Sequence, residues 1–308
     1  MDNEAADIMI SSISKNTMKQ YLPLIIEWAK YCKSFNIPIL TPKITDIIRY
    51  LTVRFQEGLS YGSLNCLRSA LAFIIGPHLG SDNNIKRLFR GFYKLRPPRP
   101  KYNSTWDVSC LLDYIENNYI QQTKLEDMTK KTVTLLMLAT GQRAQTMALI
   151  NINNTIVRDD CINIKIDKLI KTSGPNRYQP FLTIPFFNSR VGICPAKAVI
   201  DYINITKKLR SSDKLFISTK KPYRGVTSNT ISRWVKNTMK ECGIDINTFS
   251  AHSTRHAATS AAYKRGVNID DIRRTAGWTG ESTTFARFYM RPVINNKSFA
   301  EAIFKSSS

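Results

Sequence analysis

The chain has 308 residues, more than one hydrophobic core usually serves, so we expect two domains. Hydrophobic residues make up 43% of it, but apolar runs such as "TLLMLAT" are far shorter than a membrane-spanning helix, which excludes an integral membrane protein. Its 45 Lys and Arg residues against 23 Asp and Glu residues give a formal net charge of +22, dispersed along the sequence. This charge predicts a polyanionic partner, nucleic acid first, because membrane-surface and ribosomal proteins usually carry basic tails or blocks.

The N-terminal stretch "MDNEAADIMISS" is acidic and polar, unlike the basic and then apolar start of a secretory signal. The six cysteines lie at least 33 residues apart and form no CxxC pair. This spacing argues against a zinc ribbon and against a disulfide framework, so we expect buried, reduced thiols. Together these features predict an intracellular protein.

Residues 1 to 95 show helical periodicity throughout. Four amphipathic helices are predicted, at 14–35, 41–58, 60–76 and 83–95, the second and third of them ending at a glycine. The stretch "RPPRPKYN" follows at 96–103, where three prolines within five positions forbid regular secondary structure. We therefore place a basic linker at 96–104 and a second domain at 105–308.

The second domain begins with predicted helices at 104–118 and 125–141. Residues 155–187 then alternate apolar and polar side chains, interrupted by Asp159 and Asp160 and by "TSGPN", which predicts a three-stranded antiparallel sheet. Helices return at 194–209 and 227–243. The fold class is thus mainly α with one small antiparallel β-sheet, which excludes a doubly wound nucleotide-binding fold. Since GxGxxG and GxxxxGK[ST] loops are also absent from the sequence, we expect no nucleotide cofactor.

The stretch "AHSTRHAATSAA" at 251–262 holds two of the three histidines of the chain. His252 and His256 have the i, i+4 spacing of a helical zinc pair, but Ser253 stands where a zinc protease has glutamate. Arg255 between them would repel a dication, so we expect no metal. His252 and Arg255 share a helix face that suits a phosphate group, although a salt bridge of Arg255 is the ordinary alternative.

Four motifs, one of them in this stretch, follow the same order as in a known family. They are "ATGQR" with Arg143, "HSTR" with His252 and Arg255, "AGW" with Trp278 and "FYMRP" with Tyr289. The set resembles the active site of the tyrosine recombinases, the phage-integrase superfamily, over residues 139 to 292. The "KTSGP" turn and the "FYMRP" ending resemble, more specifically, recombinases of eukaryotic mobile elements, including tyrosine-recombinase retroelements.

The resemblance implies the site and its reaction. Tyr289 would be the nucleophile that forms a 3′-phosphotyrosyl link to DNA, and Trp278 would contact the phosphate. The two arginines would clamp the phosphate oxygens, with no metal, cofactor or ATP. The family's lysine falls in "DKLIKTSG", where we choose Lys171, with Lys168 as the alternative. His252 would accept the tyrosine proton or donate to the phosphate, whereas we expect His256 to pack beside it.

The resemblance also implies an organisation and partners. Residues 1–95 would form a SAM-like, core-binding DNA domain and residues 105–308 the catalytic domain. We expect double-stranded DNA as the partner, a homotetramer on synapsed DNA, a monomer or dimer in its absence, and no membrane. Localisation would follow the DNA, in the nucleus for a eukaryotic host. The segment 293–308 is expected to form a short helix that docks on a neighbouring protomer.

The spacing between Trp278 and Tyr289 departs from that of many family members and leaves two alternative functions open. Trp278 and Tyr289 are 11 positions apart, more than in many members of the family, and Arg287 occupies the place that the shorter spacing would give the nucleophile. A type IB topoisomerase that relaxes DNA is one alternative to a recombinase. The other is a catalytically inactive DNA-binding protein derived from a mobile element, in which Tyr289 is a core aromatic residue.

Overall fold

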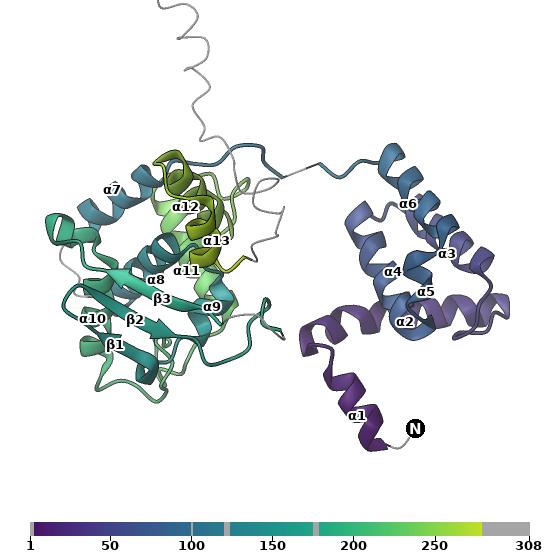
Figure 1. Cartoon of the computed structure of the whole chain (residues 1–308), viewed down its shortest axis with the longest axis horizontal. Coiled ribbons are helices and arrows are strands. Elements are labelled where there is room, and N and C mark those ends of the chain that lie inside the picture. Colours follow the sequence, from purple (N-terminus) through teal and green to yellow (C-terminus); the bar gives the residue numbers. More distant parts are fainter. Residues whose placement is uncertain (1–2, 100, 120–123, 175–178, 279–308) are drawn as a thin grey trace, which may run out of the picture. The chain divides into compact units, whose positions relative to one another are not determined.

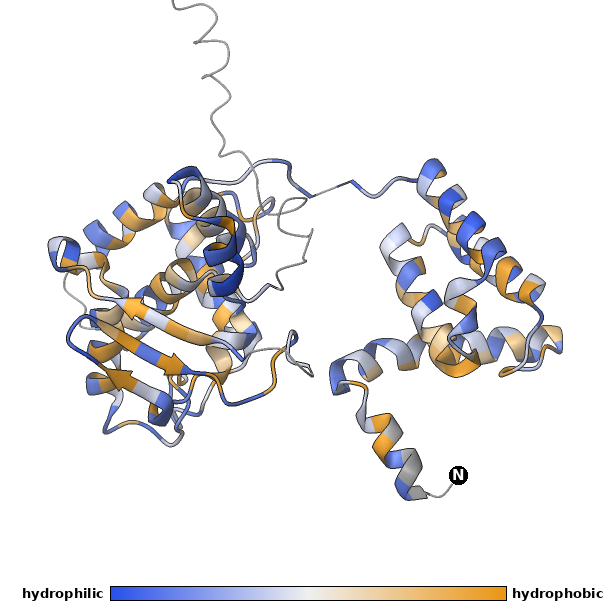
Figure 2. Ribbon diagram, in the orientation of Figure 1, coloured by the Kyte–Doolittle hydropathy of each residue, from blue (hydrophilic) through white to orange (hydrophobic). Residues whose placement is uncertain are grey.

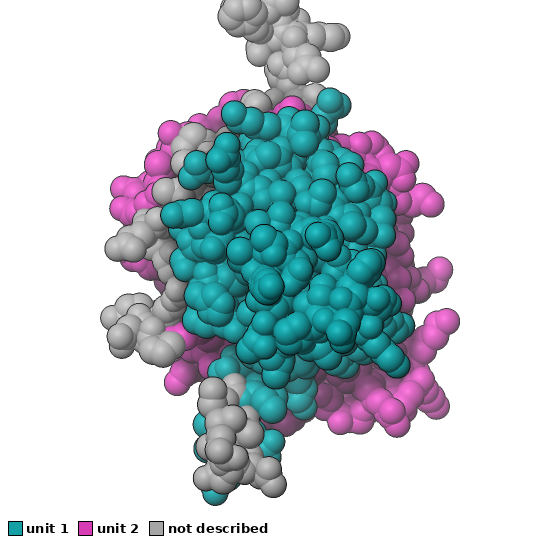
Figure 3. Space-filling model, turned by 90° about the vertical axis from the view of Figure 1, so that its right-hand side faces the viewer, with its two compact units in different colours: residues 1–100 teal, residues 101–308 magenta. Residues whose placement is uncertain are grey.

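We describe a computed structural model of the chain at residues 3–99, 101–119, 124–174 and 179–278 (Figure 1). The chain forms two compact units, residues 1–100 and 101–308 (Figure 3). They are called unit 1 and unit 2 below, and each is described by itself. The division falls inside the proline-rich segment in which the sequence predicts a linker.

Unit 1 is a bundle of helices. They are α1 (Asn3–Ser11), α2 (Lys15–Phe35), α3 (Ile44–Gln56), α4 (Tyr61–Ile75), α5 (His78–Ser81) and α6 (Asn83–Leu95). The four predicted helices are present, each opened by a cap or a capping box, as when the Ser14 and Ser60 side chains accept backbone N–H groups. The sequence prediction missed α1 and α5, because the first lies in a polar stretch and the second has only four residues, too few for a helical period.

The core of unit 1 is built from aromatic and branched aliphatic side chains of α2, α3, α4 and α6. Trp28 is fully buried, packs at 5.0 Å from the Tyr50 ring, and donates its indole N–H to the Ile39 carbonyl at 3.0 Å. A buried indole keeps its hydrogen bond in this way, which removes the desolvation cost of the N–H group.

Unit 2 contains helices around a small sheet. Its helices are α7 (Val108–Asn118), α8 (Leu125–Thr140), α9 (Ala144–Leu149), α10 (Pro195–Thr206), α11 (Ser228–Glu241), α12 (Ser253–Lys264) and α13 (Ile269–Ala276), with 3₁₀ turns η1 (Ile152–Asn154) and η2 (Asn188–Ile193). Its strands are β1 (Thr155–Val157), β2 (Cys161–Lys165) and β3 (Phe181–Pro185). The predicted class, mainly α with a small antiparallel sheet, is confirmed.

The sheet has the order β1-β2-β3 with both pairs antiparallel. Strand β2 is central, and four of its five residues are buried, whereas β3 alternates exposed and buried side chains. Ile162 pairs with Ile184 and Ile164 with Leu182, so these apolar side chains share the covered face. The long β2–β3 connection carries both candidate lysines, Lys168 and Lys171.

Helix α8 runs through the middle of unit 2 and packs against α10, α11 and α12. Ten of its 16 residues are buried, five of them apolar and five polar, and four of the polar ones are threonines. The helix ends at Gly141, which adopts a left-handed conformation with φ 58°. This turn directs the chain straight into Arg143 and α9.

Among the residues that the structure describes, no helix is long and apolar enough to cross a membrane. All six cysteines are free thiols, but only Cys32, Cys161 and Cys194 are buried. Cys110 is exposed, and Cys66 and Cys242 are half-buried. The expectation that all six are buried was therefore wrong, because a cysteine on an amphipathic helix can lie at the edge of its apolar face.

Candidate active site

The junction between α8 and α9 positions Arg143. Arg143 is the N-cap of α9, with an extended backbone (φ −82°, ψ 153°), and its side chain is half-buried. A Cβ atom on Gly141 would lie 3.4 Å from both Ala276 Cβ and Thr259 Cγ2, so the glycine also lets α12 and α13 approach the junction. The "ATGQR" motif thus brings Arg143 next to the helix that bears Arg255.

Arg255 on α12 is completely buried, which is rare for a charged side chain. Its Nη1 atom donates to the Gly141 carbonyl at 2.6 Å and to the Ala276 carbonyl. Both carbonyls lie at the C-terminal ends of helices, where the partial negative charge stabilises a cation. Arg255 therefore binds the ends of α8 and α13 together, a role that its sequence position did not indicate.

Trp278 follows the left-handed Gly277 that ends α13. The Cζ atom of Arg255 lies 3.7 Å from the centroid of the Trp278 ring, a cation–π contact, and the backbone N–H of Trp278 donates to the Arg273 carbonyl at 2.8 Å. The structure thus brings Trp278 and Arg255 into direct contact. Tyr289 and the segment 293–308 lie outside the described residues.

His252 is the N-cap of α12, one residue before the helix begins. Its side chain reaches solvent, but the surrounding protein partly desolvates the ring. This desolvation, followed by the charges of Arg255, Arg143 and Lys171, lowers the pKa of His252 to about 4. The imidazole is thus neutral at pH 7 and lies among three of the predicted cations.

Lys171 lies in the turn after β2 with its side chain exposed, and its backbone N–H donates to Gln145 Oε1 of α9 at 3.3 Å. Lys168, the alternative, is exposed as well. The charge of Lys171 acts on His252, whereas Lys168 is not among the groups that shift this histidine. Electrostatic proximity thus favours Lys171 over Lys168 as the lysine of this cluster.

His256 is buried and packs edge-on against two rings. Its ring centroid lies 5.3 Å from that of His252 and 5.5 Å from that of Tyr102. In the part of the chain that the structure describes, no three His, Cys, Asp or Glu side chains gather as metal ligands would. The two ring contacts place His256 in packing beside His252.

Sequence reasoning missed three polar contacts that support these residues. Buried Gln142 bonds to the end of α13, Gln145 holds the backbone of the lysine turn, and the Trp106 indole N–H donates to Ser253 Oγ at 2.9 Å, next to His252. Their partners lie between 26 and 147 positions away along the chain, so no local pattern signals them.

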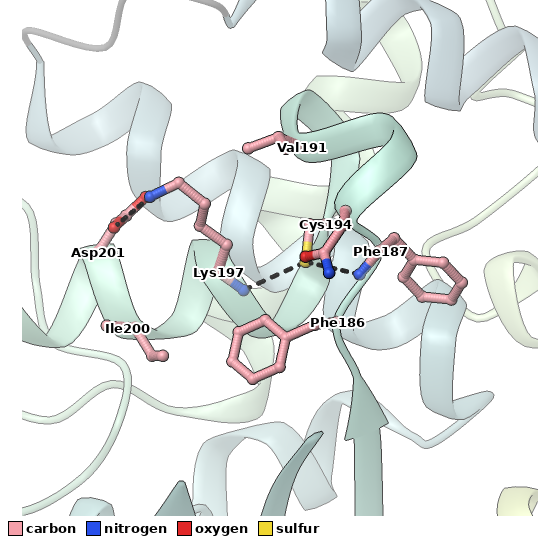
Figure 4. Close-up of a pocket in the computed structure, with 8 residues that line it drawn as sticks. Phe186, Phe187, Val191, Cys194, Lys197, Ile200 and Asp201 are labelled. Atoms are coloured by element: carbon pink, nitrogen blue, oxygen red, sulfur yellow. Dashed lines mark hydrogen bonds and ion pairs between the residues drawn. The ribbon is translucent and has the colours of Figure 1, made fainter. Parts of the chain in front are cut away.

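A hollow of about 200 Å³ lies elsewhere in unit 2, at the start of α10 (Figure 4). Phe186, Phe187 and Ile200 line it, Lys197 pairs with Asp201 at its rim, and the buried Cys194 accepts hydrogen bonds from backbone N–H groups. None of the predicted site residues lines this hollow.

The neutral state of His252 can be measured. In the chain without DNA, we expect its titration by NMR to give a pKa near 4, because protonation would add a fourth positive charge to the cluster. Only three histidines occur in the chain, so His→Asn variants at each position assign the signals, and His78 in unit 1 is the internal control.

The sign of the accompanying stability change follows from this shift. Because the folded-state pKa is depressed below the ordinary value of 6.5, the unfolded chain binds the proton more readily between about pH 6.5 and 4. His252 should therefore make the folded state less stable as pH falls through that window. A pKa of 6.5 or higher for His252 would contradict the cationic surroundings.

Comparison with known proteins gives a consistent result. The sequence matches the phage integrase family over residues 107–293, more than half of the chain. It is 26% identical over 192 residues to tyrosine recombinase XerC of Caldanaerobacter subterraneus, covering 62% of this chain and 48% of XerC. It is 24% identical over 220 residues to tyrosine recombinase XerA of Saccharolobus solfataricus, covering 70% of this chain and 63% of XerA. The chain thus spans about half to two thirds of the length of these relatives.

A solved structure shares the fold. The crystal structure of a lambda integrase(75-356) dimer bound to a COC′ core site superposes with a TM-score of 0.55, at 15% identity, over 93% of each chain. The residues that match the family enclose the cluster around His252 and make up more than half of the chain. This chain therefore belongs to the phage integrase family.

Proposed function

We propose that the chain is a site-specific DNA recombinase that cleaves and rejoins strands through a 3′-phosphotyrosyl intermediate. The observation that carries the proposal is that the charges of Arg143, Lys171 and Arg255 all act on His252, in a protein of formal charge +22. Three cations beside a neutral imidazole make a site for an anion, and a phosphodiester suits it.

The reaction begins with the nucleophile. The Tyr289 oxygen attacks the phosphorus and forms a P–O bond, while the bond from phosphorus to the 5′ oxygen breaks. At pH 7, ionising a free tyrosine costs about 4 kcal/mol, so a proton acceptor lowers the barrier. His252, kept neutral before DNA binds by desolvation and by its cationic neighbours, accepts this proton once the negative phosphodiester lies among those cations and offsets their charge.

The leaving oxygen needs a proton, and the negative charge that grows on the phosphate needs positive charge beside it. Lys171 donates a proton to the 5′ oxygen, and Arg143 and Arg255 stabilise the negative charge that grows on the non-bridging oxygens. Trp278 packs against Arg255 and excludes water from that side. The energy of the broken bond is kept in the phosphotyrosine, so rejoining by another strand's 5′-hydroxyl needs no ATP.

The assignment of Lys171 makes a distinct prediction. Lys171→Ala should slow strand cleavage about 10²- to 10⁴-fold, the usual effect of removing a general acid. A substrate with sulfur at the 5′ bridging position should restore most of the rate, because a thiolate leaves without a proton. Lys168→Ala is the matched control and should keep the wild-type rate on both substrates; a sulfur-rescued defect at Lys168 would move the role there.

We further propose that unit 1 holds the duplex. In α6 the side chains of Ile85, Phe89 and Phe92 are buried, while Lys86, Arg87, Arg90 and Lys94 are exposed at spacings that place them on one face. The outer side of this helix is hydrophilic in Figure 2. Such a row of cations can contact successive phosphates along a DNA strand.

Replacing these four α6 cations with glutamine should weaken binding to duplex DNA and flatten its salt dependence. The slope of log K against log[salt] should fall by about 0.9 for each phosphate that the protein no longer neutralises, measured by fluorescence anisotropy. The control replaces four exposed lysines of α2, namely Lys15, Lys19, Lys30 and Lys33, which changes the net charge equally. Equal weakening in the two variants would show that overall charge, and not the α6 face, determines binding.

Assembly on DNA belongs to the same proposal. The lambda integrase structure of similar fold is a dimer bound to a core site. By analogy we propose dimers of this chain on its site and a tetramer when two sites synapse, which crosslinking on DNA would measure.

The function is tested with a suicide substrate. A duplex selected from a randomised pool for binding to the full chain is nicked beside the cleavage position, so that the released 5′ end diffuses away. The proposal expects an SDS-resistant protein–DNA adduct and exchange between two such sites. Relaxation of arbitrary plasmid DNA without exchange would instead indicate a topoisomerase. Absence of any adduct would indicate a DNA-binding protein that does not cleave DNA.

A further inference from the structure

We propose that Gln142 is a positioning residue for strand cleavage, which fixes Arg143 relative to the turn that carries Trp278. The inference rests on the proposed function, because it assigns a role in that reaction. Gln142 is 1% exposed, and both ends of its amide are used. Its Nε2 atom donates to the Thr275 carbonyl at 2.7 Å, and its Oε1 atom accepts from Thr146 Oγ1 at 3.1 Å.

These bonds run beside those of Arg255. Arg255 donates to the carbonyls of Gly141 and Ala276. Gln142 is the residue after Gly141, and it donates to the carbonyl of Thr275, the residue before Ala276. The end of α8 and the end of α13 are thus held by two adjacent links. A Cβ atom on Gly277 would lie 3.3 Å from Gln142 Nε2, so the left-handed glycine leaves room for the amide.

The link matters because α13 is a short helix with a small apolar face. It has eight residues, of which Ile272 and Ala276 are buried. Among the described residues, Ile272 packs in a small cluster with Ala262, Ile269 and Trp278, so the polar links at the C-terminal turn carry a larger share in fixing the helix. Trp278 follows this turn two residues after Ala276, and the segment containing Tyr289 continues from it.

At the other end the link acts on Arg143. Gln142 directly precedes Arg143, and Thr146 lies on the first turn of α9, which Arg143 caps. A side chain that bonds to both Thr146 and Thr275 fixes the peptide from which Arg143 projects. The amide supplies a donor to the carbonyl and an acceptor to the hydroxyl at once. Glutamate would face the Thr275 carbonyl with an acceptor, and methionine would make neither bond.

The experiment uses the full chain and the selected suicide duplex. It compares wild type with Gln142→Met and Gln142→Glu, and measures the cleavage rate constant at saturating DNA, the Kd and the thermal midpoint. We expect the rate constant to fall about 10- to 100-fold in both variants with unchanged Kd, as for a misplacement of about 1 Å. The 5′-bridging sulfur should not restore the rate, because the defect lies at Arg143 and Trp278 rather than at Lys171.

Two further variants separate positioning from stability. Thr132→Val removes a buried hydroxyl of α8 that bonds to Met128 and Ala198 carbonyls, remote from the cluster, and should lower the thermal midpoint while keeping the rate constant. Thr146→Val removes only the partner of Gln142 Oε1 and should slow cleavage several-fold, which keeps the test valid if the Gln142 variants do not fold.

A wild-type rate constant in Gln142→Met, or in Thr146→Val if the former is unfolded, would overturn the inference. An equal slowing in Thr132→Val would do the same, since it would show a general effect of stability, and so would rescue by sulfur. Absence of an adduct with the wild-type chain would overturn the proposed function itself, and the inference with it.

Discussion

Replacing Tyr289 with phenylalanine is expected to abolish the covalent adduct while DNA affinity stays unchanged. Phenylalanine keeps the ring but has no oxygen to attack the phosphorus, so the cleavage rate should fall at least about 10⁴-fold, as for other removed nucleophiles. The measurement is SDS gel analysis of the suicide duplex, with anisotropy for the Kd.

The matched control is Tyr263→Phe, at an exposed tyrosine of α12. It should cleave at the wild-type rate. An adduct that persists in Tyr289→Phe would show that another group attacks the DNA. An adduct absent from both the wild type and Tyr289→Phe would favour the inactive relative that the spacing after Trp278 leaves open.

The second large effect separates the two arginines. Arg143→Ala and Arg255→Ala should each slow cleavage about 10²- to 10³-fold, since each removes a cation from the phosphate site. Only Arg255→Ala should also lower the free energy of unfolding, by about 3 kcal/mol, because it leaves buried carbonyls of Gly141 and Ala276 without this donor. Half-buried Arg143 has no such role among its described contacts.

Urea unfolding of the full chain and single-turnover cleavage measure the two effects side by side. Arg255→Lys provides a graded comparison, since an ammonium keeps the charge and a donor for the carbonyls but lacks the planar guanidinium whose Cζ atom lies 3.7 Å from the Trp278 ring centroid. It should recover part of the stability and little of the rate. Equal destabilisation by Arg143→Ala would contradict the division of roles between the two arginines.

Much of the fold could be predicted because its signals are local. Helix α2 shows its period and its Ser14 cap in the sequence, and the alternation along β2 and β3 marks the sheet. Helix α5 has only four residues, too few for a period, and α1 lies in a polar stretch. The exposed Cys110 shows the same limit, because residue type alone does not say where on a helix face a side chain lies.

The candidate site was predictable only in part. The glycine before Arg143 and the spacing of His252 and Arg255 are visible in the sequence. The sequence does not show that Arg255 turns its Nη1 atom toward backbone carbonyls, since a carbonyl looks the same at every position. For the same reason Gln142 gave no signal: its partner, the Thr275 carbonyl, is 133 positions away. The choice of Lys171 over Lys168 was made from the sequence and stays a prediction; the structure adds that the charge of Lys171 acts on His252.

The position of Arg255 also bears on how such a protein decays when selection on its activity ends. Because this side chain holds two helix ends inside the core, its replacement destabilises the folded protein as well as slowing the reaction. Half-buried Arg143 carries no such structural penalty among its described contacts, so neutral drift can reach it first. In descendants that only bind DNA, Arg255 is therefore expected to be kept longer than Arg143. The presence of Arg255 alone is then weak evidence that a relative is catalytically active.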